Sequence, residues 1–334
     1  MTTPAASDYH DRKTGLVLFG VLEIAIGFIC LLLILLMLIG QAVASRNPSA
    51  QPGLSGLAPA MTVYALLAVA FVWLGIGSIL ARRWARALLL CFSAVALVGG
   101  SIGCVSMAFI LPHMFDAIAQ QSQQPIQPGA MLVAKVVAAV FMFIVYIVIP
   151  GALFLFYRSP HVKRTCEARD PVERWTDLCP LPVLAFSLVM GLAGIALLGM
   201  VGRFHGFPVF GAFVSGGRGM LLCLLMSAVL LYLAWGFYRL QLRAWWVALA
   251  MQVVWAVSNF VTFWRTDVAD LYLKMGADHR TAAMSAQLLA APAFKWLIAL
   301  SVIGWVVWLF CVRRYFDTPE LPLVPSGGEV PPLL

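Results

Sequence analysis

The chain has 334 residues, of which 62% are hydrophobic and only 11% are charged, and its formal net charge is +8. Soluble globular domains carry about 25% charged residues, so this composition excludes an ordinary soluble protein and favours an integral membrane protein. The positive charge includes no basic run with interleaved aromatic residues, which argues against nucleic acid as a partner. The lipid bilayer, with its anionic headgroups, is the expected partner instead.

Eight apolar segments are long enough to cross a membrane as helices, which takes about 20 residues each. None alternates with a period of two, so the pattern of a transmembrane β-barrel is missing. The sequence therefore predicts an all-α, polytopic integral membrane helix bundle. Its eight transmembrane helices are expected at residues 15–40, 61–81, 86–112, 131–157, 181–201, 219–239, 244–264 and 293–313.

The first apolar segment is followed by Ala42-Val43-Ala44, a pattern typical of a signal-peptidase site. However, its apolar stretch is about 26 residues long, whereas the apolar core of a signal peptide needs only about 7–15. We therefore expect this segment to remain as the first transmembrane helix.

Lys and Arg are concentrated in alternate connecting segments. The tight turns Arg82–Arg86 and Arg239–Arg243 are the clearest cases, because short loops follow the positive-inside rule best. The asymmetry predicts a multi-pass protein of the plasma (inner) membrane with both termini cytoplasmic. Residues 158–180 would then form the main cytoplasmic loop.

A short polar pattern, D-x-x-[D/E]-R-x-T, precedes two of the apolar segments about 160 residues apart. Its two copies are Asp8, Asp11, Arg12 and Thr14, and Asp170, Glu173, Arg174 and Thr176. Further matches at a similar spacing pair Gly77 with Gly236, Trp84 with Trp245 and Lys135 with Lys295, while Gly27 pairs with Gly194 at a slightly larger one.

These matches predict a parallel internal repeat of four plus four helices, with the two halves entering the membrane from the same side. The first repeat would span residues 1–160 and the second residues 161–319, followed by a disordered tail at 320–334. The Pro-rich composition of that tail is typical of disorder.

The opening motif of the second half has the pattern of a helix start. Asp170, Pro171 and Glu173 are suited to an N-cap, a first helical position and a capping box. Asp170 and Arg174 stand four residues apart, as do Asp8 and Arg12, so each could form an ion pair on one helix face. We therefore expect a short interfacial helix at 170–178, with a structural role for the motif.

Glu23 is the one acidic residue well inside an apolar segment. A charge there costs roughly 2.5–3.5 kcal/mol, so Glu23 should face the bundle and be neutral. Gly20 and Gly27 lie on the same helix face and would let a neighbouring helix approach. Depth counted from the cytoplasmic ends places Ser93, Ser187 and Gln252 level with Glu23, which predicts a polar layer in which the repeat pairs Glu23 with Ser187 and Ser93 with Gln252. This layer serves either helix packing or a ligand or proton site.

Other groups of His, Asp and Cys residues give weaker evidence for a functional site. His113 lies near Asp116 and Asp278 lies beside His279, which is weak support for a metal or acid–base site. Cys166 and Cys179 share a loop with one His but lack the paired-ligand spacing of a zinc site, so free reduced thiols are expected. The sequence therefore predicts no metal and no cofactor.

Three classes of function remain. An enzyme would need a nucleophile–base or metal cluster, which the membrane segments lack. A carrier suits the duplicated architecture, with a small-molecule site between the repeats near Glu23, although no helix has a Pro in its middle third. We therefore expect a non-catalytic membrane subunit or scaffold, with other membrane subunits or a second copy as partners. The carrier is the alternative.

Overall fold

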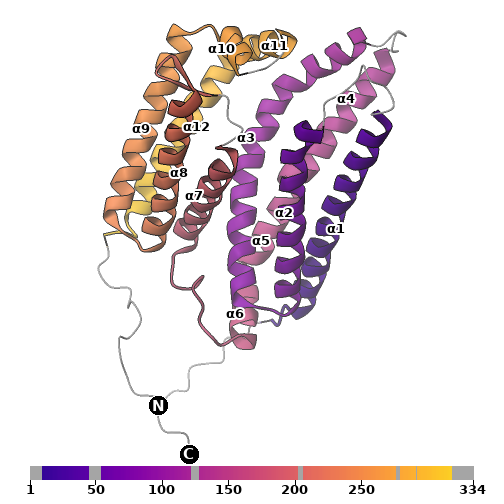
Figure 1. Cartoon of the computed structure of the whole chain (residues 1–334). Coiled ribbons are helices and arrows are strands. Elements are labelled where there is room, and N and C mark those ends of the chain that lie inside the picture. The colour runs from indigo at the N-terminus through magenta and orange to yellow at the C-terminus, as the bar shows by residue number, and fades with distance from the viewer. Residues whose placement is uncertain are drawn as a thin grey trace, which may run out of the picture. The chain divides into compact units, whose positions relative to one another are not determined.

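The computed structural model describes residues 10–44, 54–121, 128–201, 206–275, 279–290 and 292–317. Within these ranges, eight helices are long and apolar enough to cross a membrane, which confirms the predicted class (Figure 1). The spans are Lys13–Val43, Ala60–Ile79, Arg83–Ala108, Gly129–Arg158, Leu181–Gly199, Gly216–Tyr238, Leu242–Arg265 and Trp296–Arg313. The four-plus-four repeat stays a prediction, and the tail at 320–334 lies outside the described residues.

The chain divides by its contacts into two compact units. The first unit comprises Met1–Val98 and Ile144–Asp177, and the second comprises Gly99–Phe143 and Leu178–Leu334. The helix α3 (Arg83–Gln121) contributes residues to both units.

The first unit is built around an antiparallel helix pair, α1 (Lys13–Ala44) and α2 (Leu54–Ile79), which lie side by side in Figure 1. The N-terminal part of α3 packs on α2, where the Phe71 and Phe92 rings meet edge to face at 5.1 Å. The π-helical turn η1 (Ile144–Val148), α5 (Ile149–Arg158) and α6 (Pro160–Arg169) complete this unit.

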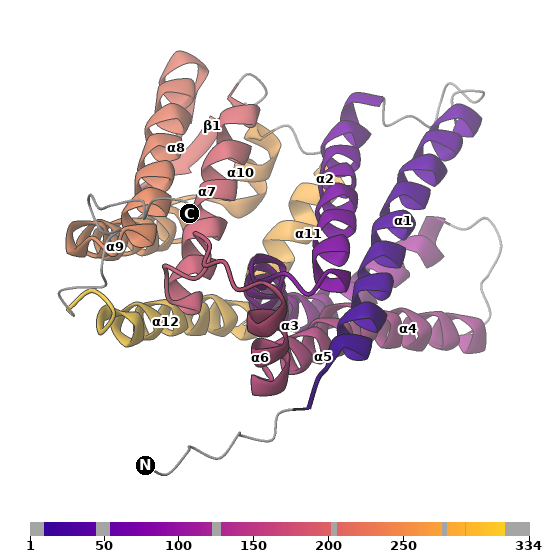
Figure 2. The same ribbon diagram turned by 90° about the horizontal axis from the view of Figure 1, so that it is seen from below.

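The second unit contains α4 (Pro128–Phe143) and a group of helices later in the chain. The pair α7 (Leu181–Met200) and α8 (Gly216–Tyr238) packs closely, and Figure 2 shows it beside α9 (Leu242–Arg265) and α12 (Pro292–Arg313). Trp245 of α9 is fully buried and donates its indole N–H to the Leu309 carbonyl of α12 at 2.8 Å. The short helices α10 (Val268–Lys274) and α11 (His279–Ala290) connect α9 to α12.

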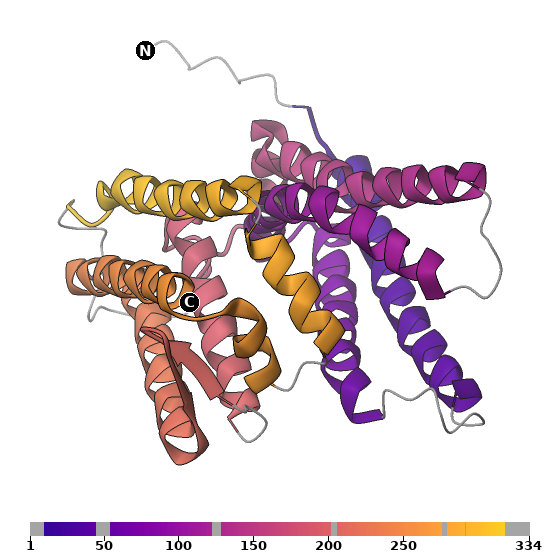
Figure 3. The same cartoon turned by 90° about the horizontal axis from the view of Figure 1, so that it is seen from above.

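A β-hairpin in the second unit was not predicted from the sequence. Strands β1 (Gly206–Val209) and β2 (Ala212–Ser215) pair antiparallel and lie next to α8 and α9 (Figure 3). The two turn residues, Phe210 and Gly211, both have positive φ, as in the tight turns that suit hairpins. Their amides donate to side chains of α9, namely Ser258 and Thr262.

The predicted interfacial helix at 170–178 is wrong. The helix in this region is α6, which ends at Arg169, and the following residues through Pro180 are turns and irregular backbone. Asp170 caps the end of α6, since its N–H donates to the Cys166 carbonyl at 2.9 Å. Pro171 disfavours helical backbone at the residue before it, so it marks a helix end here rather than a start.

Two helix corners have the same backbone geometry. At the end of α2, the Arg82 N–H bonds the Gly77 carbonyl and Ala81 has a φ of 53°. At the end of α8, the Gln241 N–H bonds the Gly236 carbonyl and Leu240 has a φ of 52°. Both are Schellman caps with a non-glycine residue in the left-handed conformation. In each, the glycine lies against an alanine of the next helix, Ala85 or Ala244.

Candidate functional site

Glu23 faces the interior of the first unit, as the sequence predicted, and its side chain is fully buried. Glycines position it by letting α1 and α2 approach. A Cβ built on Gly20 would lie 2.7 Å from the Gly75 carbonyl oxygen, and one on Gly75 would lie 2.6 Å from the Gly20 oxygen. A Cβ on Gly27 would come within 2.9 Å of the Val72 side chain. The predicted glycine face is thus confirmed.

Two hydroxyl groups from other helices meet Glu23. The Tyr157 hydroxyl of α5 donates to Glu23 Oε1 at 2.9 Å and lies 2.6 Å from the Ser78 hydroxyl of α2. Ser78 in turn donates to the Leu16 carbonyl of α1 at 3.0 Å. We call Glu23, Ser78 and Tyr157 the polar trio. All three side chains are buried, and the second carboxyl oxygen of Glu23 has no hydrogen-bond partner among the described residues.

The protons of this network can be counted. Three contacts join the Glu23 carboxyl, the two hydroxyls and the Leu16 carbonyl in a row, so three protons are needed to make each contact a hydrogen bond. The two hydroxyls supply one each, and the carbonyl supplies none. The third is present only when Glu23 is protonated; its carboxyl O–H then donates to Tyr157, and Tyr157 donates to Ser78 instead of to Glu23. The geometry therefore favours a neutral Glu23, in agreement with the cost of burying an unpaired carboxylate.

The sequence did not indicate Tyr157 or Ser78, because both lie one residue from a helix end. Side chains of an α-helix lean toward its N-terminus. Glu23 therefore leans toward the start of α1, whereas Tyr157 leans away from the end of α5. The two helices are antiparallel, since Gly15 of α1 lies against Phe156. Matching positions by Cα depth alone therefore misses such a pair.

Two of the other three members of the predicted polar layer, Ser93 and Ser187, have hydrogen-bond partners of their own. Ser93 is buried and donates to the Leu90 carbonyl within its own helix. Ser187 donates to the Ala234 carbonyl of α8 at 2.6 Å, and Gln252 is half-buried in α9. Glu23 and Ser93 belong to the first unit, while Ser187 and Gln252 belong to the second. A layer of all four residues stays a prediction.

The second unit has an apolar cluster where α7, α8 and the turn after α12 meet. Phe186 of α7 lies 4.2 Å, centroid to centroid, from Phe237 of α8. Phe237 in turn meets Phe316 edge to face at 5.1 Å. Met190 lies one turn further along α7 and is also buried. We call Met190, Phe237 and Phe316 the apolar trio.

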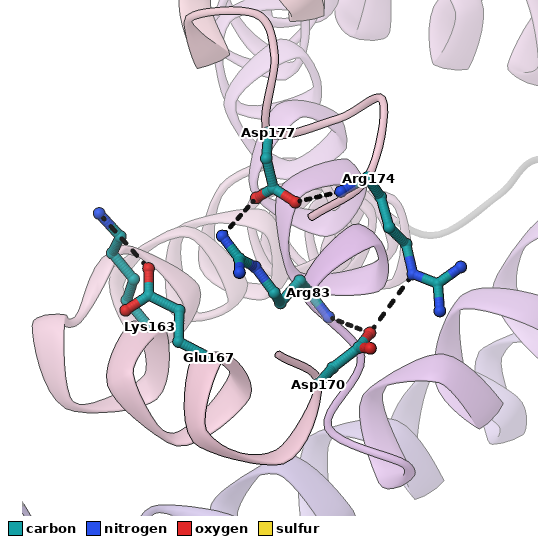
Figure 4. A network of polar contacts seen from close by, with 6 residues as sticks. All are labelled: Arg83, Lys163, Glu167, Asp170, Arg174 and Asp177. Atoms are coloured by element: carbon teal, nitrogen blue, oxygen red, sulfur yellow. Dashed lines mark hydrogen bonds and ion pairs between the residues drawn. The ribbon is translucent and has the colours of Figure 1, made fainter. Parts of the chain in front are cut away.

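An ionic network surrounds the second copy of the opening motif (Figure 4). The buried carboxylate of Asp170 lies 3.5 Å from both Arg82 and Arg174, and it accepts the backbone N–H of Arg83. Asp177 pairs with the Arg83 side chain at 3.5 Å and accepts the Arg174 N–H. The predicted Asp170–Arg174 pair is therefore present, although the backbone between these residues is not helical.

The first copy of the motif contacts α6. The Arg12 N–H donates to the hydroxyl of Thr165, and Asp11 pairs with Arg169 at 2.8 Å. The hydrogen bond from Arg169 lowers the pKa of Asp11 below its usual value. Asp8 lies outside the described residues, so its predicted pair with Arg12 stays a prediction. In the second copy, the equivalent acid, Glu173, is exposed.

The weaker candidates carry no assembled site in the described part of the chain. No group of three or more His, Cys, Asp or Glu residues able to hold a metal occurs there. Asp278 and the side chains of His113 and Asp116 fall outside it. Cys166 and Cys179 are both buried, and neither forms a disulfide within the described residues. Burial raises the pKa of the Cys166 thiol to about 11, so this thiol is a poor nucleophile at neutral pH.

Comparisons of the chain with models of known protein families, with curated proteins and with solved structures found no match.

Proposed function

We propose that this protein is a non-catalytic membrane subunit or scaffold, whose buried polar groups serve to fix helices against one another. The supporting observation is where these groups form their hydrogen bonds. Five of them bond a neighbouring helix, namely Ser78 on α1, Tyr157 on α1, Ser187 on α8, Ser227 on α7 and Trp245 on α12, whereas Ser93 bonds within its own helix. Enzymes instead converge such groups on one open cleft.

The internal repeat belongs to the same proposal, and local packing supports it. Residues of α7 have numbers 167 above their counterparts in α1, and those of α8 and α12 have numbers 159 above α2 and α5. At these offsets, the Gly27–Val72 contact corresponds to the Gly194–Leu231 contact, and Gly20–Gly75 corresponds to Ser187–Ala234. The two Schellman corners also correspond, which pairs Trp84 with Arg243 instead of Trp245.

The same offsets place the apolar trio at the positions of the polar trio: Met190, instead of Ser187, for Glu23, Phe237 for Ser78 and Phe316 for Tyr157. Both sets are buried, and the contact between Phe237 and Phe316 corresponds to the contact between Ser78 and Tyr157. A duplicated scaffold would thus have one polar and one apolar version of the same helix junction. The apolar version needs no ligand for its packing, which favours a packing role for the junction as a whole.

A carrier of protons or small cations is the second candidate. The unpartnered carboxyl oxygen of Glu23 is one observation in its favour, because a proton or cation could occupy that oxygen. The second is the π-helical turn η1, which lies near the middle of the fourth span and just before Pro150. Such turns free backbone groups and are frequent at functional sites.

We further propose that the protein lies in the plasma (inner) membrane with both termini in the cytoplasm, on the basis of the Lys and Arg distribution. Single cysteines placed at positions 50, 168 and 275 of a cysteine-free variant test this orientation. A membrane-impermeant maleimide added to intact cells should label positions 50 and 275 only. Labelling at position 168 from outside would refute the orientation.

Reconstitution distinguishes the two candidate functions. We expect proteoliposomes containing the protein to collapse an imposed pH or sodium gradient no faster than empty liposomes. The protein can also be extracted from membranes with a polymer that keeps the surrounding lipids. After the mass of the lipids is subtracted, a scaffold should have a defined mass larger than the 36.4 kDa of one chain. The Glu23→Gln variant should have the same mass. A monomer whose ion flux is abolished by Glu23→Gln would refute the scaffold proposal and support the carrier.

A further inference from the structure

A surface groove in the first unit combines three indole rings with a guanidinium group. Trp73 of α2, Trp84 of α3, and Arg174 and Trp175 of the loop after α6 line a hollow of about 380 Å³, here called the tryptophan groove. We propose that the tryptophan groove binds the headgroup phosphate of an anionic glycerophospholipid. The proposal concerns a specific lipid site and is independent of whether the protein is a scaffold or a carrier.

The walls of the groove are fixed by packing. The Trp73 and Trp84 rings stack with their centroids 4.3 Å apart. Gly77 makes this possible, because a Cβ at that position would lie 2.8 Å from the Trp84 ring. The stacked pair therefore forms a flat apolar surface, and more than half of the Trp73 side chain is exposed on it. An acyl chain or glycerol backbone is the kind of group that such a surface accommodates.

The position of the groove along the helices suits a lipid headgroup. It lies where the second span ends at Ile79 and the third begins at Arg83. Trp73 is six residues before that end, or about 9 Å along a helix. Tryptophan is typical of the boundary between the headgroups and the hydrocarbon region. The groove therefore extends from the depth of the upper acyl chains to the level of the phosphates.

Arg174 supplies the phosphate-binding group. It approaches Asp170 through Nε at 3.5 Å, and in Figure 4 its two terminal nitrogens point away from both Asp170 and Asp177. No hydrogen bond or ion pair to these terminal nitrogens occurs within the described ranges. Two parallel N–H groups of a guanidinium are matched to two oxygens of a phosphodiester.

The charge balance around the groove favours an anion. Among the described residues, the guanidinium groups of Arg82, Arg83 and Arg174 form ion pairs with two carboxylates, those of Asp170 and Asp177, so this paired set has one excess positive charge; the exposed Glu173 is not part of it. A phosphodiester with one negative charge would neutralise this excess charge. A phosphatidylcholine headgroup would bring a second cation beside the arginines, so a lipid with net negative charge is preferred.

Native mass spectrometry of the full-length protein tests this inference. The detergent-purified protein would be titrated with phosphatidylglycerol and, separately, with phosphatidylcholine of the same acyl chains. We expect one phosphatidylglycerol to bind in preference to phosphatidylcholine. Arg174→Gln should weaken that binding about tenfold, as expected for the loss of a charge-assisted contact. Trp73→Leu should weaken it too, and this variant leaves the ionic network intact.

Matched exchanges outside the groove provide the controls. Arg158→Gln removes an exposed arginine near the same end of the first unit, and Trp264→Leu removes an exposed tryptophan of α9. Both should change lipid binding less than twofold. Equal binding of the two lipids to the unmodified protein would overturn the proposal, as would an equal loss in Arg158→Gln. Displacement of the lipid by millimolar inorganic phosphate would show a simple anion site and would overturn it as well.

Discussion

Replacing Tyr157 by Phe tests the polar trio most directly. The exchange removes one hydroxyl and leaves the ring in place, so the packing against Phe19 and Phe156 should be preserved. Ser78 keeps its bond to the Leu16 carbonyl. Glu23 loses its one hydrogen-bond partner within the described residues and stays fully buried. Leaving a buried polar group unsatisfied costs about 1–3 kcal/mol, and we expect a loss of stability in that range.

Adding Glu23→Met to the Tyr157→Phe variant should restore much of the lost stability. Met190 stands at the position that the proposed repeat pairs with Glu23, and Phe316 at that of Tyr157. The double variant therefore copies two residues of the apolar trio into the first unit. Replacing both partners of a hydrogen bond by apolar groups of similar shape can be nearly neutral, so the double variant should be more stable than Tyr157→Phe alone.

The assay is reversible unfolding in mixed detergent micelles, measured as the free energy of unfolding of each variant. Tyr146→Phe is the matched control, because Tyr146 lies in the same span but is 44% exposed. Its effect should stay within about 0.5 kcal/mol. Additive losses from Glu23→Met and Tyr157→Phe would refute the reasoning, since they would mean that the two side chains are not energetically coupled.

Three further predictions concern other parts of the chain. In detergent at pH 7, N-ethylmaleimide should modify the exposed Cys311 but should modify Cys166 only after unfolding, because the Cys166 thiol is buried and has a pKa of about 11. Peptide mass spectrometry measures the modification of each cysteine. Asp11→Asn should slightly lower the thermal midpoint at pH 7. Because the folded pKa of Asp11 is lowered, the difference from the unmodified protein should vanish as the pH falls through that pKa. Gly75→Ala should cost about 1–3 kcal/mol of unfolding free energy, since its Cβ would lie 2.6 Å from a backbone oxygen, whereas Gly40→Ala, with nothing within 4 Å, should cost much less.

Much of the fold could be predicted because apolar length and glycine spacing are local signals. Eight apolar stretches predict eight spans, and Gly20 and Gly27 on one face of α1 predict which side of that helix meets another. The hairpin at 206–215 gave no such signal. Its strands are only four residues each and depend on bonds from the turn amides to Ser258 and Thr262, some 50 residues later.

The opening motif shows why sequence patterns can be placed in the wrong structural context. Asp170, Pro171 and Glu173 suit a helix start, yet Pro160 starts the helix ten residues earlier and Pro171 follows its end. An aspartate at position 170 is compatible with the predicted N-cap of a following helix and also with the C-cap of α6 that it forms. Its pairing with Arg82 and with the Arg83 amide comes from the corner between α2 and α3, almost 90 residues earlier, which local reasoning does not include.

The difference between the two trios bears on why Glu23 is there at all. If the proposed repeat is correct, Met190, Phe237 and Phe316 pack the same junction without any buried hydrogen bond between their side chains. Stability alone would then not require an acid in the first unit, because an apolar trio serves the same packing. The polar trio would instead add specificity, since Tyr157 has to meet both Ser78 and Glu23 in one register, or it would hold a proton that a carrier moves. If the Glu23→Met, Tyr157→Phe variant stays folded but loses its native assembly, the polar trio serves to fix the helix register. If the variant keeps its assembly and loses ion flux, the polar trio serves transport.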